Sequence, residues 1–150
     1  AIGLSLAAML IYIWIRFEWQ FSIGAILALL HDVLLTLGVF SLFSFEINLS
    51  IVAAVLTIVG YSMNDTVVIF DRIRENLKSK EEGYNETIQL SVNESFRRTT
   101  FTSITTLIPL LSIILFGSYS LFWFSLALSL GILVGSYSSI LLAPSLLLKD

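Results

Sequence analysis

Long apolar runs separated by short polar turns dominate the pattern of this chain. A helix needs about 20 mostly apolar residues to cross the ~30 Å hydrocarbon core of a bilayer, so such runs are candidate membrane spans. The pattern predicts an all-α, multi-pass transmembrane helix bundle with five spans in a single domain. The predicted spans cover residues 1–15, 21–45, 49–70, 99–117 and 121–148. The first is shorter than required, and we expect its upstream end to be cut or to lie at the interface.

One long polar segment, residues 71–98, separates the third span from the fourth. We expect its first part, to about Leu77, to continue the third helix into water, and the sequence Lys78–Gly83 to break that helix. Apolar residues then recur at every fourth position, at Tyr84, Ile88, Val92 and Phe96. This spacing predicts an amphipathic helix on the membrane surface, either a linker or a docking surface for another protein.

The composition agrees with a membrane protein and excludes several kinds of site. Hydrophobic residues make up 57% of the chain and charged residues only 13%, whereas soluble domains carry about 25% charged residues. There is no cysteine and a single histidine, so we expect no thiol chemistry, no common metal centre and no bound cofactor. No phosphate loop, nucleophile elbow or nucleic-acid signature is present, so we expect neither covalent catalysis nor a nucleic-acid partner.

The basic residues predict the orientation of the chain in the bilayer. If Arg16 is cytoplasmic, five spans place segment 71–98 and Lys149 on the same side. The other turns, near Glu46 and at 118–120, contain no Lys or Arg, as the positive-inside rule requires. We therefore expect segment 71–98 and the C-terminus to be cytoplasmic. The chain starts in apolar sequence without an initiator methionine, so we expect it to be part of a longer protein.

Asp65 is the strongest candidate for a functional residue, because it lies inside the third span. Insertion scales give a cost of about 2.5–3.5 kcal/mol for Asp at the centre of a membrane helix. A carboxyl group between an apolar environment and a nearby cation can take up and release protons, and Arg98 is the natural counter-charge. The structural alternative is a protonated Asp65 bonded to another helix. For the neighbouring Asn64 we favour such a structural bond over cation binding.

Two further groups of polar residues lie within predicted spans. His31 and Asp32 in the second span form either a proton relay or a mutually satisfied polar pair that locks helix packing. Thr102 and Thr106 lie one turn apart in the fourth span. Their hydroxyls could hold a file of water that reaches an acid. The alternative is interhelical hydrogen bonding, which contributes about 0.6 kcal/mol on average.

Small residues at four-residue spacing predict two helix-packing faces. Gly24 and Ala28 lie in the second span, and Gly131 and Gly135 form a GxxxG pattern in the fifth. Such pairs allow the backbones of neighbouring membrane helices to approach closely.

The sequence Gly-Tyr-Ser-Met-Asn-Asp-Thr-Val-Val-Ile-Phe-Asp-Arg-Ile-Arg-Glu-Asn at 60–76 resembles the signature of SecF proteins in the SecD/SecF family. Three further stretches agree: 16–19, 30–33 and 93–106. The resemblance covers essentially the whole chain. It implies helices two to six of a six-helix protein, forming half of a membrane domain of the resistance-nodulation-division type, with SecD supplying the other half. A first helix and a periplasmic domain would be missing from the chain.

The resemblance also implies a function. Members of the family sit in the bacterial inner membrane and use the proton-motive force, or a sodium gradient, to promote protein export beyond the SecYEG channel. The family's ion-path aspartate and arginine correspond to Asp65 and Arg98, whereas the missing periplasmic domain would handle exported polypeptides. The residues do not decide whether the coupling ion is a proton or a sodium ion. Two other functions stay open: a passive structural subunit of the Sec machinery, and half of a small-molecule exporter.

Overall fold

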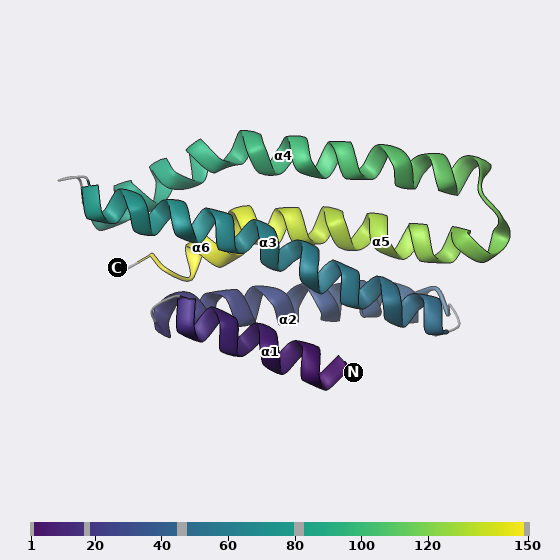
Figure 1. The fold of residues 1–150 in the computed structure, drawn as a ribbon. Coiled ribbons are helices and arrows are strands. Elements are labelled where there is room, and N and C mark those ends of the chain that lie inside the picture. The colour runs from purple at the N-terminus through teal and green to yellow at the C-terminus, as the bar shows by residue number, and fades with distance from the viewer. Residues whose placement is uncertain (1, 17–18, 45–47, 80–82, 149–150) are drawn as a thin grey trace.

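The fold is a bundle of helices with one central member, α3 (Figure 1). The computed structural model describes residues 2–16, 19–44, 48–79 and 83–148, and within these ranges there is no strand. The helices are α1 (Ile2–Arg16), α2 (Trp19–Leu42), α3 (Leu49–Ser79), α4 (Tyr84–Phe116) and α5 (Tyr119–Tyr137), followed by the π-helix η1 (Ser138–Leu142) and the short α6 (Ala143–Ser145). The predicted all-α class is confirmed.

Four stretches of the described chain are long and apolar enough to cross a membrane. They are Phe21–Leu42, Leu49–Ser79, Tyr84–Phe116 and Tyr119–Ser145. With 15 residues, α1 rises only about 22 Å, so the predicted first span remains a prediction. Asn48 begins α3 by accepting a hydrogen bond from the Ile51 backbone N–H on its Oδ1 at 3.0 Å, which satisfies one free donor of the first turn.

The polar segment differs from its prediction in one respect. As expected, α3 continues past the apolar run, to Ser79, but the amphipathic helix at 84–98 is the first half of α4 rather than a separate surface helix. Its apolar side packs on α3: Ile88 is buried, whereas Phe96 is exposed. At 100° per residue, a four-residue repeat drifts by about 40° each turn, which turns Phe96 away from the buried side.

Hydrogen bonds join the polar halves of α3 and α4 into a helical hairpin. Asn76 Nδ2 donates to Ser91 Oγ and to Glu94 Oε2, each at 2.9 Å, and Arg72 Nε donates to Glu94 Oε2 at 2.7 Å. Asn76 and Ser91 are buried. These bonds give the polar hairpin a specific register that apolar packing alone would not fix.

Replacing Asn76 with Ala is expected to loosen this hairpin. The change removes two hydrogen bonds and leaves the buried Ser91 hydroxyl without its donor, so we expect a loss of about 1–3 kcal/mol in unfolding free energy. Thermal unfolding in detergent would measure it. Asn93→Ala is the matched control, because Asn93 is exposed on α4 and should be nearly neutral. Equal stabilities of the two variants would contradict the prediction.

A polar layer divides the interior into two apolar clusters. One cluster joins α1, α2, α3, α4 and α6 around Phe21, Phe70 and Ile73. The other joins α2, α3, α4 and α5 around Phe40 and Ile58. The side chains buried in α3 between Ile58 and Ile69 include Ser62, Asp65 and Thr66. The candidate functional residues are therefore enclosed by apolar packing on both sides along α3.

Candidate functional site

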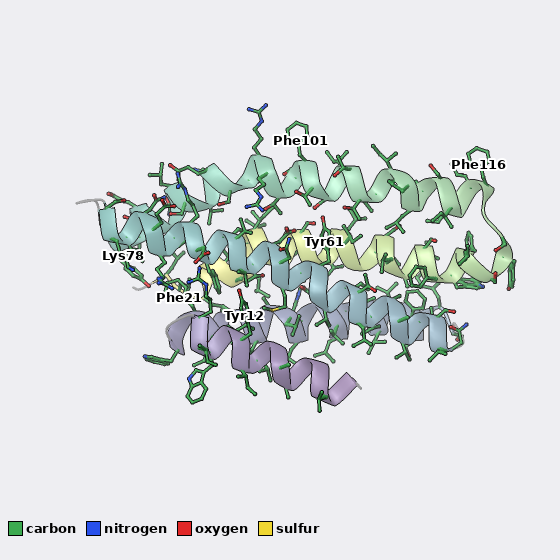
Figure 2. All side chains as sticks on the ribbon, viewed as in Figure 1. Tyr12, Phe21, Tyr61, Lys78, Phe101 and Phe116 are labelled. Carbon is green, nitrogen blue, oxygen red and sulfur yellow. The ribbon has the colours of Figure 1, made fainter. Side chains whose placement is uncertain are left out.

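The Asp65 side chain points into the bundle. It is only 4% exposed, and its Oδ2 atom has no hydrogen-bond partner among the described residues. Tyr61, one turn earlier on α3, donates from its hydroxyl to Ser103 Oγ on α4 at 3.3 Å (Figure 2). A buried acceptor without a donor is costly. Asp65 Oδ2 is therefore the interior atom at which we expect a ligand or a proton to bind.

Arg98 lies on α4, at the level where it can attract the Asp65 carboxylate. The two interact electrostatically, but in the described part of the chain no hydrogen bond or ion pair within 4.0 Å joins them. Arg98 is exposed, and the backbone carbonyl of the same residue accepts a hydrogen bond from Thr102 Oγ1 at 2.9 Å. The predicted counter-charge is therefore near Asp65 without being locked to it.

A charged cavity of about 640 Å³ adjoins Arg98 at the hairpin end of the bundle. Its lining comes from the end of α1, the second half of α3 and the first half of α4: Arg16, Val68, Asp71, Arg72, Arg74, Glu75, Lys78, Glu94, Ser95 and Arg98. Val68 follows Asp65 by one turn on α3, so the cavity ends about one turn from the carboxyl group. A polar cavity of this size has ample room for water.

Ion pairs bring the basic residues of separate elements to this cavity. Arg16 Nη2 lies 3.1 Å from Asp71 Oδ2, and Arg74 Nη1 donates to the Arg16 carbonyl at 2.9 Å. These contacts place the C-terminal end of α1 beside α3. Five described basic residues thus line the same cavity: Arg16, Arg72, Arg74, Lys78 and Arg98. Lys149 lies outside the described residues.

His31 and Asp32 on α2 are in contact with each other and with α3. Asp32 is fully buried, and its Oδ1 lies 3.2 Å from His31 Nδ1. Its Oδ2 accepts a hydrogen bond from Ser62 Oγ. Both carboxyl oxygens of Asp32 thus have a neighbour, and Asp32 also reaches the helix that carries Asp65.

The other predicted polar residues do not join helices. Thr102 Oγ1 and Thr106 Oγ1 donate to carbonyls of their own helix, those of Arg98 and Thr102, at 2.9 and 2.8 Å. Asn64 is exposed, and the described residues offer it no partner on another helix. These three side chains are therefore not part of the hydrogen-bonded layer inside this chain.

Serines that the sequence reasoning did not select make the interhelical bonds instead. Ser103 Oγ on α4 bonds Ser136 Oγ on α5, and Ser139 Oγ in η1 bonds Thr66 Oγ1 on α3 at 2.9 Å. The cluster of hydroxyl residues at 136–139, within an otherwise apolar run, could have indicated these interhelical bonds from the sequence.

The small residues allow α5 and α6 to approach the other helices. Gly131 lies against Ile58, where an added Cβ would fall 2.1 Å from the Ile58 Cδ1 atom. Gly135 lies against Ser62. Gly24 faces Phe70 and the carbonyl of Ala143, and Ala28 is buried in the same cluster. The described residues hold no group of three or more His, Cys, Asp or Glu side chains that could bind a metal.

Comparison with known proteins gives matches along nearly the whole chain. Residues 1–149 match the family model described as "Protein export membrane protein SecD/SecF, C-terminal". The chain is 48% identical over 149 residues to protein translocase subunit SecF of Cereibacter sphaeroides, covering 99% of this chain and 46% of that protein. It is 50% identical over 152 residues to the SecF subunit of Rhodothermus marinus, covering 97% and 49%. The chain thus spans about half the length of these relatives.

Solved structures give the same match. A crystal structure of SecDF from Thermus thermophilus, described as a translocon-associated membrane protein, superposes with a TM-score of 0.90 at 44% identity. The match covers 95% of this chain and 20% of that one. SecDF in a super-membrane-facing form gives a TM-score of 0.89, also at 44% identity, covering 94% and 19%.

Proposed function

Because this chain belongs to the SecD/SecF family of protein export membrane proteins, we propose that it is the membrane domain of a SecF subunit that couples an ion gradient to protein export. Asp65 binds and releases the coupling ion, a proton or Na⁺. The observation that carries the proposal is the buried Asp65 Oδ2, which has no hydrogen-bond partner in the described chain. Intramembrane carboxyl groups are costly and rare, and ion pathways and proton relays are among the roles they serve.

The surroundings of Asp65 support the transfer of an ion. The charged cavity that ends near Val68 offers a route for water and ions from the hairpin end of the bundle. Arg98 attracts the ionised carboxylate but does not form a closed ion pair with it in the described chain, so the carboxylate stays open to a competing cation. If Arg98 formed a permanent ion pair with Asp65, the carboxylate would already be neutralised and would not bind another cation.

In the proposed cycle, loading of Asp65 changes the force between α3 and α4. Binding of a proton or Na⁺ neutralises the carboxylate and removes its attraction to Arg98. The two helices can then shift, together with the half of the membrane domain that SecD supplies. The movement would reach domains outside the membrane, which pull exported polypeptides away from SecYEG. This arrangement requires an inner-membrane location with the α3–α4 hairpin and the C-terminus in the cytoplasm.

Ion flux in liposomes that contain the complete SecD–SecF pair tests this function. Proton and sodium gradients are imposed separately, and the flux is followed with a pH-sensitive and a sodium-sensitive dye. We expect one gradient to drive flux well above that of protein-free liposomes. No flux with either gradient, together with export that persists after both are dissipated, would favour the passive structural subunit instead.

A further inference from the structure

The turn of α3 that carries Asp65 is held by hydrogen bonds from two other helices. Ser62 Oγ, one turn before Asp65, donates to Oδ2 of Asp32 on α2. From η1, Ser139 Oγ donates to the Ser62 carbonyl at 3.2 Å and also contacts Thr66 Oγ1 at 2.9 Å. Because Ser139 uses its one hydroxyl proton on the carbonyl, Thr66 is the donor in the second contact. We call Asp32, Ser62, Thr66 and Ser139 the α3 clamp.

The α3 clamp is tightly enclosed. A Cβ placed on Gly135 would lie 3.2 Å from Ser62 Cβ and 3.7 Å from Asp32 Oδ2, so the backbone of α5 covers the bond between them. Asp32 and Ser139 are both fully buried. The π-helical stretch η1 begins directly after α5, and it holds Ser138 and Ser139 side by side in the interior. Water therefore cannot easily replace a lost partner in this layer.

Two carboxyl groups are buried among the described residues, and they differ in their partners. Each oxygen of Asp32 has a neighbour that can donate: His31 Nδ1 for Oδ1 and Ser62 Oγ for Oδ2. Asp65 has an oxygen without any partner in the described chain. A satisfied carboxyl group suits the holding of a neighbour, whereas an unsatisfied one suits the binding of a ligand.

We propose that Asp32 is a positioning residue for Asp65, acting through Ser62 to fix the rotation of α3 about its axis. This inference rests on the proposed function of Asp65. A carboxyl group on α3 lies some 5 Å from the helix axis. A rotation of the helix by about 20° would therefore move this group by roughly 2 Å. Displacements of about 1 Å at a reacting group are enough to lower rates strongly. The α3 clamp thereby sets the distance from Asp65 to Arg98 and to the charged cavity.

The test removes a single hydrogen bond from the α3 clamp in the complete SecD–SecF pair. Ser62→Ala deletes the donor to Asp32 with a minimal change of volume. Ser129→Ala is the matched control, because Ser129 is also buried but donates to the Ser125 carbonyl of its own helix. We expect gradient-driven flux to fall about 10-fold in Ser62→Ala, the size expected for the loss of one buried hydrogen bond, and to stay near wild type in Ser129→Ala.

A second readout separates positioning from general damage. The infrared carbonyl band of protonated Asp65, identified by its loss in Asp65→Asn, should move in Ser62→Ala and in Asp32→Asn but not in Ser129→Ala. Thermal unfolding of the complex shows whether each variant is folded. Wild-type flux with an unmoved band in Ser62→Ala overturns the positioning role, while loss of flux in Asp65→Asn keeps the proposed function. Unchanged flux in Asp65→Asn overturns both.

Discussion

Replacing Asp65 with Asn is expected to reduce gradient-driven ion flux to the level of protein-free liposomes and to remove the gradient-dependent part of protein export. The amide keeps the shape of the carboxyl group but can neither take up a proton nor bind a cation as a charged ligand. The protein should still fold, because the change takes a potential charge out of a buried site that lacks a partner for Oδ2. Flux in liposomes and an export assay in cells would measure the two effects.

Glu86→Gln is the matched control for this prediction. It makes the same carboxylate-to-amide change, but Glu86 is exposed in the first turn of α4 and does not line the charged cavity. Flux should therefore stay close to wild type in this variant. Comparable loss in both variants would point to a general effect of removing a negative charge. Normal flux in Asp65→Asn would remove this carboxyl group from the mechanism.

Gly131→Ala is expected to destabilise the bundle more than the same change at the helical glycines Gly24, Gly38 and Gly135. The new Cβ would lie 2.1 Å from Ile58 Cδ1 and 2.3 Å from Cγ1, inside a cluster where Ile58 is 1% exposed. Either Ile58 leaves its rotamer or α5 moves away from α3, and overpacking of this kind costs about 1–3 kcal/mol. Thermal unfolding of the purified protein would show the loss.

Gly38→Ala separates this packing effect from the general effect of removing a helical glycine. Gly38 on α2 has no atom within 4 Å of the position a Cβ would take. Alanine there should be neutral or stabilise the helix by up to about 1 kcal/mol, since glycine is the poorer helix former. If Gly131→Ala and Gly38→Ala gave the same unfolding temperature, close packing at Gly131 would not be important for stability.

The sequence pattern was sufficient to predict that the chain is helical and that Asp65 is buried. Apolar runs and their lengths determine where membrane helices can form, and a carboxyl group near the middle of such a run must point inwards. The start of α4 was misjudged because the four-residue spacing from Tyr84 to Phe96 resembles a surface helix. Its actual partner is the second half of α3, and a single sequence does not show which apolar face meets which helix.

The hydrogen-bonded layer was harder to predict than the charges. Thr102 and Thr106 were selected for their spacing, but threonine in a helix readily bonds the carbonyl four residues back, and both do so. The hydrogen bond from Ser62 to Asp32 depends on how α2 and α3 are rotated about their axes. Hydrophobic periodicity does not define this rotation, because these helices are apolar on all sides. The π-helical stretch that positions Ser139 has no clear signature in sequence.

The unbroken path of α4 has a mechanical consequence. The helix runs without interruption from the polar hairpin into the membrane part, 33 residues and about 50 Å in all. Tyr84 lies about 21 Å from Arg98 along the helix, so a tilt of this first half by about 10°, pivoting at Arg98, would move its tip by roughly 4 Å. A small movement beside Asp65 would then appear as a larger displacement at the hairpin, which a spin label could record.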